Sequence, residues 1–386
     1  MIFRILEDQY AEKSAEAKAS DARFMQLALT LGRRGQGRCW PNPAVGAVIV
    51  KDGIIVGRGW TQPGGRPHAE PVALAQAGAA ADGATLYVTL EPCSHVGKSP
   101  PCADAVIAAG IVRVVSAIED PNPEVAGQGH ARLRAAGVRV DVGLGAQDAA
   151  RAHAGHFYRV RHKRPYVVLK LAVSPDGKIA AAGHRPVAVT GEAARARVHL
   201  LRAQCDAVLV GIGTVLADDP ELTCRLPGMA ARSPVRVVLD RALRLPGTTR
   251  LVHSAREHPL WVMTSSLSEA PAAMKLGAAG AHVFRVPTTT TPPPGLDLPA
   301  VLRALAEKGI ARLLVEGGSR VASSFVTAGL VDEIWLFRGP TPIGGDGINA
   351  LDALPLSAIT GSPDFAVHAS ETLENDTLTV YERCKP

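Results

Sequence analysis

Long hydrophobic runs are missing from this 386-residue sequence, and aromatic residues make up only 4% of it. No apolar stretch approaches the roughly 20 residues that a membrane-spanning helix needs, so the sequence does not predict a membrane protein. The first twenty residues contain four acidic side chains and lack the basic start and apolar middle of a secretion signal. We therefore expect a cytoplasmic protein.

Cysteines are also few. The six present are widely scattered, which does not resemble the disulfide framework of a small secreted protein and makes metal binding the more relevant question. The net charge is +6, but the arginines are dispersed and few aromatic residues accompany them, so the composition gives little support for nucleic-acid binding. A phosphorylated small substrate would also need basic residues.

The length predicts two domains of ordinary size. Apolar periodicity predicts that helices and strands alternate in both halves, which indicates α/β domains. In the first half we expect helices at 21–35, 70–78 and 103–109, and strands at 45–50, 54–56, 85–89 and 112–117. In the second half we expect strands at 166–171, 208–210, 235–239, 260–263, 313–315 and 334–337, and a surface loop at 287–295.

A basic segment at 159–165 that ends in proline marks the expected boundary between the halves. We expect an N-terminal extension at 1–20, a first domain at 21–164 and a second domain at 165–386.

Three potential metal ligands occur in the first half. His68 precedes a predicted helix, with Glu70 two residues further on, while Cys93 follows a predicted strand and Cys102 precedes another helix. Three ligands leave a fourth tetrahedral position for water, which indicates catalysis, and the nearby carboxylate is placed to move the proton of that water. A closed structural zinc site, or a buried histidine beside two unrelated thiols, is the alternative.

The order of these residues is typical of zinc nucleobase deaminases, whose pattern is H-x-E followed by P-C-x-x-C. Here eight residues instead of two separate the cysteines, and the segment 90–102 (LEPCSHVGKSPPC) strongly resembles the expanded cysteine loop of the bifunctional riboflavin-biosynthesis deaminase-reductases. Residues 41–46 (PNPAVG) match the substrate-binding turn of that family, and 120–123 (DPNP) and 125–129 (VAGQG) also fit its pattern.

The resemblance implies roles for individual residues of a cytidine-deaminase-like, three-layer α/β domain. It implies that His68, Cys93 and Cys102 hold zinc, that Glu70 is the general acid/base, and that Asn42 hydrogen-bonds the pyrimidine. His95 and Lys98 would lie against a substrate phosphate or ring, although a loop lysine can also be simply solvated.

Glycine turns are the main feature of the second half. Residues 211–214 follow a predicted strand, but no third glycine completes a G-x-G-x-x-G dinucleotide motif. Residues 314–320 (LVEGGSR) run from a strand through glycines into a helix, an arrangement that suits phosphate. Six segments occur in the order found in the family's reductase domain, which resembles dihydrofolate reductase in fold: 169–171, 174–178, 190–191, 198–203, 214–223 and 316–318.

This second resemblance implies two sets of contacts. The residues expected to contact NADPH are Ala172, Thr214, Asp218, Gly318, Ser319, Arg320, Val321, Ala322, Ser323 and Ser324. The residues expected to contact the substrate are Lys170, Asp176, Leu222, Arg225 and Glu316. The guanidinium of Arg225 suits a phosphate, whereas a helix end and turn is the alternative interpretation of 218–220.

Two positions depart from the family pattern. Pro175 stands where leucine is usual, and Ala188 stands where a tryptophan is common. The missing aromatic side chain would remove one wall beside the cofactor, so we expect altered cofactor contacts in this chain.

Together the resemblances predict a bifunctional enzyme of small-molecule metabolism that uses zinc and NADPH. The first activity would be hydrolytic deamination of 2,5-diamino-6-ribosylamino-4(3H)-pyrimidinone 5′-phosphate, and the second would be reduction of its ribosyl group to ribityl. We expect a homo-oligomer that binds neither nucleic acid nor membranes. The alternatives are a nucleic-acid or nucleoside deaminase with an unrelated C-terminal domain, and a non-catalytic zinc-stabilised binding protein.

Overall fold

The computed structural model describes residues 18–95, 100–123, 125–184, 187–289, 294–352 and 354–384. The chain divides between His162 and Lys163 into two compact units, each of which is described by itself. Both units contain a β-sheet with helices packed on it, so the predicted α/β class is confirmed. Within the described ranges, no helix combines the length and the apolar character needed to cross a bilayer.

The first unit is built on a five-stranded sheet with the order β2-β1-β3-β4-β5. Its strands are β1 (Gly46–Lys51), β2 (Ile54–Trp60), β3 (Thr85–Val88), β4 (Arg113–Ser116) and β5 (Arg139–Val142). The predicted hairpin of β1 and β2 is confirmed, and β1 also runs antiparallel to β3. β3, β4 and β5 are parallel.

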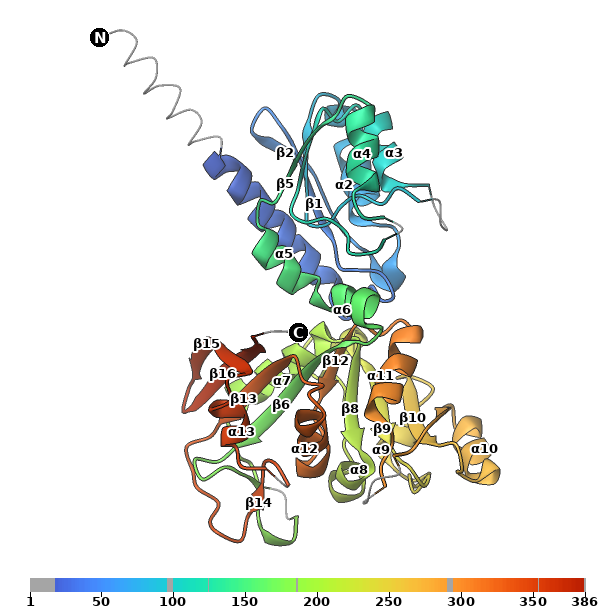
Figure 1. Cartoon of the computed structure of the whole chain (residues 1–386), viewed down its shortest axis with the longest axis vertical. Coiled ribbons are helices and arrows are strands. Elements are labelled where there is room, and N and C mark those ends of the chain that lie inside the picture. Colours follow the sequence, from blue (N-terminus) through green and yellow to red (C-terminus); the bar gives the residue numbers. More distant parts are fainter. Residues whose placement is uncertain are drawn as a thin grey trace, which may run out of the picture. The chain divides into compact units, whose positions relative to one another are not determined.

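Helices cover both faces of this sheet (Figure 1), so the predicted three-layer arrangement is confirmed. The helices are an N-terminal one at 18–32, α2 (Ala69–Ala77), α3 (Cys102–Ala108), α4 (Gln128–Ala135), α5 (Ala146–Ala152) and α6 (Ala154–His162). Alternate side chains of β1 enter the two cores, as a strand's pleat requires: Ala47 and Ile49 pack with α2 and α3, and Val48 and Val50 pack with the N-terminal helix.

Two glycines of β2 allow α2 to approach the sheet closely. A Cβ atom on Gly57 would lie 2.3 Å from the carbonyl oxygen of Ala73, and one on Gly59 would lie 2.1 Å from that of Ala69. Neither position therefore has room for a side chain. This close packing determines where the first turn of α2 lies.

The second unit contains a nine-stranded sheet with the order β11-β10-β9-β8-β12-β6-β13-β16-β15. The strands are β6 (Tyr166–Val173), β8 (Ala207–Gly211), β9 (Val235–Leu239), β10 (Leu260–Ser265), β11 (His282–Val286), β12 (Arg312–Val315), β13 (Glu333–Arg338), β15 (Phe365–Leu373) and β16 (Asp376–Arg383). From β11 to β13 neighbouring strands are parallel, and β16 and β15 continue the sheet as an antiparallel hairpin.

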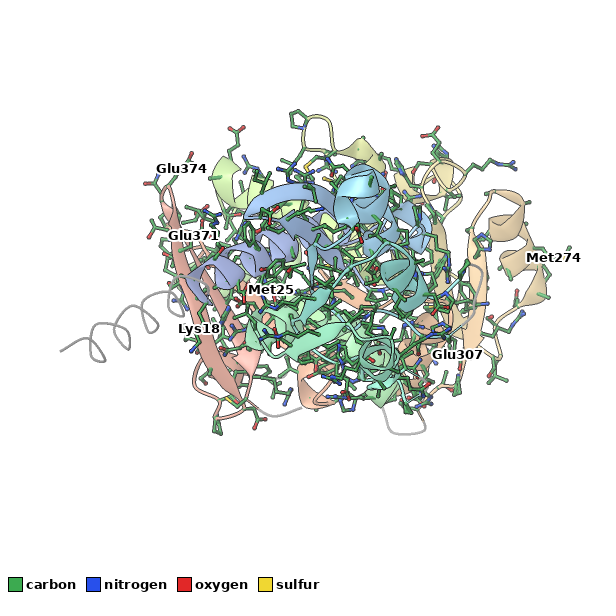
Figure 2. All side chains as sticks on the ribbon, turned by 90° about the horizontal axis from the view of Figure 1, so that it is seen from above. Lys18, Met25, Met274, Glu307, Glu371 and Glu374 are labelled. Carbon is green, nitrogen blue, oxygen red and sulfur yellow. The ribbon has the colours of Figure 1, made fainter. Side chains whose placement is uncertain are left out.

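The helices of this unit are α7 (Glu192–Gln204), α8 (Ile212–Asp218), α9 (Arg250–His253), α10 (Ala270–Ala278), α11 (Leu298–Glu307), α12 (Ser319–Thr327) and α13 (Ser357–Thr360), and β7 (Lys178–Ala180) pairs with β14 (Ile348–Asn349). Figure 2 shows Glu371 and Glu374 on the β15–β16 hairpin and Met274 on α10, toward opposite edges of the nine-stranded sheet. In the predicted loop at 287–295, the described part has one isolated bridge, from Thr288 to Leu296.

Candidate active sites

Three side chains of the first unit form a metal-binding set. His68 is the N-cap of α2, Cys93 follows β3, and Cys102 begins α3. His68 Nδ1 lies 3.3 Å from Cys102 Sγ and 3.7 Å from Cys93 Sγ, and the three ligand atoms all lie within 4.8 Å of one another. Zinc binds sulfur at about 2.3 Å and nitrogen at about 2.0 Å, so its tetrahedral ligands lie roughly 3.5 Å apart. The three residues therefore fit a zinc ion.

Hydrogen bonds hold Cys93 in a form that binds metal. The peptide N–H of Cys102 donates to Cys93 Sγ at 3.3 Å, and that of Ala103 donates to the Cys93 carbonyl at 3.1 Å. Hydrogen bonding from Cys102 lowers the pKa of Cys93 to about 4 in spite of burial, and the bond with Cys93 raises the pKa of His68. Cys93 is thus a thiolate at neutral pH, and the thiolate is the metal ligand.

Glu70 lies in the first turn of α2 and is only 3% exposed. Burial, helped by the charge of Cys93, raises the pKa of Glu70 to about 7. Its carboxyl group also interacts with the thiol of Cys102. A carboxyl group with a pKa near neutrality can both accept and donate a proton at the pH of the cell.

Asn42 lies on the other side of the His68 ring. Its Nδ2 is 3.3 Å from His68 Nε2 and donates to the Gly65 carbonyl at 2.8 Å. The side chain predicted to hold the pyrimidine is thus beside the ligand set. His95, two residues after Cys93, is exposed, and Lys98 lies outside the described residues.

In the second unit, Glu316 follows β12 and Lys170 lies on the neighbouring β6, where Val315 pairs with Leu169. Arg202 of α7 donates to both carboxylate oxygens of Glu316, at 2.6 and 2.8 Å. Burial alone would raise the pKa of Glu316, but Arg202 holds it below its usual range, and burial lowers the pKa of Lys170. The predicted residues Lys170 and Glu316 therefore come together, and Glu316 stays ionised.

Arg202 has no role predicted from the sequence, although this arginine stands in one of the matching segments. It also donates to the Thr223 carbonyl at 3.1 Å, and His199, three residues earlier, lies 3.2 Å from the same oxygen. Residues three apart on a helix share a face. That spacing is the signal that could have identified Arg202 beside the 222–225 segment.

The other predicted substrate contacts are more dispersed. Leu222 is buried and has a left-handed φ of 57°. Arg225 is exposed and pairs with Glu221 at 3.2 Å. Asp176 lies in the turn after β6, where it accepts from Ser174 Oγ at 2.6 Å and from the peptide N–H of Gly344 at 2.8 Å. Among the described residues, the contacts of Asp176 thus stabilise its own turn and the 343–344 segment.

The turn between β12 and α12 is joined to α8 by one hydrogen bond. The peptide N–H of Gly318, the N-cap of α12, donates to Thr214 Oγ1 at 3.1 Å. Ser319 begins the helix and is partly exposed, and Asp218 is exposed at the end of α8. Thr214, Gly318 and Ser319 therefore come together at the carboxyl ends of parallel strands, where nucleotides bind in many α/β proteins.

The remaining predicted cofactor contacts point in different directions. Ala322 and Ser323 are buried, and Ser323 Oγ accepts from the peptide N–H of Asp352 at 2.7 Å. Arg320 and Ser324 are exposed, Val321 is half-buried, and Ala172 is half-buried on β6. The structure therefore does not bring this whole set to one surface.

Two family models match the chain. The cytidine and deoxycytidylate deaminase zinc-binding region matches residues 18–118. The C-terminal domain of RibD matches residues 165–379, which is more than half of the chain. The first unit therefore has a zinc-binding deaminase domain of the cytidine deaminase type, and the second has a RibD reductase domain.

Relatives match over almost the whole chain. The riboflavin biosynthesis protein RibD of Aquifex aeolicus is 41% identical over 363 residues, which cover 94% of this chain and 98% of the relative. RibD of Escherichia coli is also 41% identical, with coverage of 89% and 94%.

Solved structures agree with these relatives. Acinetobacter baumannii RibD superimposes with a TM-score of 0.84 at 35% identity, covering 95% of this chain and 100% of the other. A deaminase/reductase from Thermotoga maritima superimposes with a TM-score of 0.82 at 36% identity, with coverage of 95% and 100%. The chain therefore belongs to the RibD family of bifunctional deaminase-reductases of riboflavin biosynthesis, which use zinc and NADPH.

Proposed function

We propose that His68, Cys93 and Cys102 hold the zinc of the deaminase and that Glu70 is its general acid/base. The observation that carries this proposal is the convergence of one imidazole nitrogen and two sulfurs within 4.8 Å, with a buried carboxylate two residues from the imidazole. When bound, zinc lowers the pKa of a water molecule so that it can attack near neutral pH. Glu70 takes a proton from the water and passes it to the leaving amine.

We propose that the deaminase substrate is a diaminopyrimidinone ribosylamine 5′-phosphate. The Thermotoga maritima relative carries the name diaminohydroxyphosphoribosylaminopyrimidine deaminase/5-amino-6-(5-phosphoribosylamino)uracil reductase, which describes this substrate and its product. Asn42 orients the ring beside His68, and the expanded cysteine loop that carries His95 and Lys98 contacts the phosphate or the ring. Ammonia leaves and a uracil-type ring remains.

We propose that the second unit reduces the ribosyl group of that product to ribityl, with a hydride that NADPH supplies. Leu222, Arg225 and Glu316 contact the substrate, Arg225 through its phosphate, and Lys170 and Asp176 line the same pocket. The residues proposed to contact NADPH are Ala172, Thr214, Asp218, Gly318, Ser319, Arg320, Val321, Ala322, Ser323 and Ser324. The hydrogen bond from the Gly318 N–H to Thr214 Oγ1 supports a shared site for Thr214, Gly318 and Ser319, whereas Ala322 and Ser323 are buried.

The test is to incubate the purified protein with the diaminopyrimidine substrate, with and without NADPH, and to measure ammonia and the reduced product. Ammonia should form under both conditions, and the ribityl product only with NADPH. Ammonia without reduction would contradict the second activity. Deamination of RNA or of a nucleoside in place of this substrate would support the alternative enzyme class.

We further propose a cytoplasmic homo-oligomer that binds no nucleic acid, with domains at 21–164 and 165–386 after an extension at 1–20. The edge strand β15 supports the oligomer: its residues from Ala366 to Thr372 are all exposed, and an unpaired edge of this kind can add a strand from another copy. Sedimentation velocity should give more than one chain per particle. A monomer at micromolar concentration would contradict it.

A further inference from the structure

The carboxylate of Glu91 is buried, with a side chain that is 0% exposed, two residues before Cys93. No role is yet assigned to it. Four peptide N–H groups donate to its two oxygens: those of Gly129 and His130 to Oε1, at 2.8 and 3.2 Å, and those of Gly127 and Asp120 to Oε2, at 3.0 and 3.2 Å. The donors are residue 120 and three residues at 127–130, within or directly beside the segments 120–123 and 125–129 that match the family pattern. These residues therefore surround the carboxyl group of Glu91.

Among the described residues, the hydrogen-bond donors to this buried carboxyl group are peptide N–H groups, and no Lys or Arg forms an ion pair with it. His130 Nδ1 lies 3.9 Å from Glu91 Oε2. Burial lowers the pKa of His130, which disfavours a charged ring. The four peptide N–H groups give hydrogen-bond partners to both buried oxygens of Glu91.

Glu91, Glu119 and His130 also lie close enough to share a metal ion, with ligand atoms within 4.8 Å. A carboxylate has about four lone-pair sites, and four N–H groups already use those of Glu91. The positive ends of these peptide dipoles also oppose a cation. The chemistry of Glu91 therefore favours an anchor over a ligand.

The anchor acts on the segment that leads to Cys93. A Cβ atom on Gly129 would lie 2.0 Å from the Pro92 carbonyl oxygen, so the first turn of α4 packs directly against the peptide before Cys93. The Glu91 N–H donates to the Ile118 carbonyl at 3.0 Å. On the other side, the peptide N–H of Cys102 holds the sulfur of Cys93.

We infer that Glu91 is a positioning residue for the zinc site, which sets the backbone of Cys93 through the N–H donors of Asp120, Gly127, Gly129 and His130. The inference rests on the proposed role of Cys93 as a zinc ligand. Residues that orient metal ligands typically change metal affinity when they are replaced. Loss of the anchor should therefore weaken zinc retention before it alters the chemistry of Glu70.

The test compares three variants of the full-length, zinc-loaded protein. Glu91→Gln keeps the shape but turns an amide N–H₂ group toward the donors, and Gly129→Ala pushes on Pro92 while leaving the carboxylate intact. Glu119→Gln is the control, since Glu119 is exposed. Zinc per chain is measured by elemental analysis, and affinity by competition with a colorimetric chelator.

We expect one zinc per wild-type chain, a zinc affinity lowered about 10- to 100-fold in Glu91→Gln and in Gly129→Ala, and no change in Glu119→Gln. Circular dichroism and urea unfolding, with hydrogen exchange of the β1 amides as the probe of the deaminase unit, report whether each variant is folded. If Glu91→Gln does not fold, the zinc affinity of Gly129→Ala tests the inference.

A wild-type chain that binds no zinc would contradict the proposed function of the deaminase site itself. One zinc held with wild-type affinity by folded Glu91→Gln, or by Gly129→Ala where that variant decides, would overturn the inference alone. Two zinc ions per chain, with one lost in Glu119→Gln, would overturn it in favour of a second metal site.

Discussion

The deaminase unit (18–162) and the reductase unit (163–384) stabilise the charges of their sites in different ways. In the deaminase unit, a thiolate and an imidazole converge with a second sulfur, within 4.8 Å, on a point that suits a cation. In the reductase unit, the central carboxylate of Glu316 already has a cationic partner in Arg202. The first site is complete only with an ion, whereas the second is balanced by the chain's own residues.

Removal of zinc should give the largest difference in activity between the two units. Dialysis against a strong chelator should abolish ammonia production, because the attacking water depends on bound zinc for its low pKa. Reduction of the deaminated substrate should stay within about twofold, since Glu316 and Arg202 need no metal. Ammonia and NADPH oxidation are measured on the same sample, and added zinc should restore the first. Parallel loss of both activities would show that the units depend on one another.

Glu70→Gln should give the next largest effect. Deamination should fall about 10²- to 10⁴-fold, the contribution typical of a positioned acid/base group, while zinc content and reduction remain at the wild-type level. Steady-state ammonia release and elemental analysis are the measurements. The exposed Glu119 provides the matched control as Glu119→Gln. A fully active Glu70→Gln enzyme would favour the non-catalytic interpretation of the zinc site.

Arg202→Met should destabilise the reductase unit by about 3–5 kcal/mol, because it leaves the Glu316 carboxylate buried without its partner. Urea unfolding measures the change in the free energy of unfolding, with hydrogen exchange of the β12 amides as the probe of this unit. Arg225→Met removes an exposed pair and should cost about 0–1 kcal/mol. Equal losses in the free energy of unfolding of the two variants would contradict the role of Arg202 as the partner of the buried Glu316 carboxylate.

Acid should act on the deaminase unit through His153. Burial, and then the charge of His156, lowers the pKa of His153 to about 4 from 6.5. The unfolded chain takes up a proton near pH 6.5 and the folded ring does not, so stability is complete above that pH and falls by on the order of 3 kcal/mol as the pH drops toward 4.

His153→Gln should remove this dependence, because glutamine cannot titrate. Urea unfolding at pH 7 and pH 5, with zinc saturating, compares it with wild type, and the exposed His282 provides the control as His282→Gln. Equal acid sensitivity in the His153 variant and in wild type would assign the effect to another group.

Ala188→Trp should have the smallest effect, and it tests whether residue 188 lies beside the cofactor. An aromatic wall beside the nicotinamide should lower the KM for NADPH by roughly threefold, in line with the 0.5–1.5 kcal/mol of an aromatic contact. Val187→Trp, at the neighbouring exposed position, should leave the KM unchanged. An unchanged KM in both variants would mean that residue 188 is away from the cofactor.

The sequence predicts that His68, Cys93 and Cys102 form one set because few residue types bind zinc and because each adjoins the end of a helix or strand, and their ligand atoms do lie within 4.8 Å of one another. Arg202 and Glu316 are 114 positions apart, and no local spacing reveals that they pair. Ala322 and Ser323, which are among the residues predicted to contact NADPH, are buried in the core. The match of the whole segment 318–324 does not indicate which of its side chains face inward.

Two elements that the sequence does not predict, β15 and α4, have weak patterns. β15 is exposed on both faces and so has no alternation of apolar and polar residues. α4 has a mostly polar sequence and begins after Gly127 in a left-handed conformation. By contrast, β1 and β2 flank a turn whose Asp52 and Gly53 both have positive φ, a strong local signal.

Gly57 and Gly59 have a consequence for how this enzyme can change. Any side chain at either position would push α2 off the strand beneath it, and with it the imidazole and the carboxylate that stand at the start of that helix. A mutational scan should therefore find these two chemically inert positions as intolerant as the reactive ones. Transplanting the deaminase machinery into another scaffold would have to carry the glycine pair along with the zinc ligands.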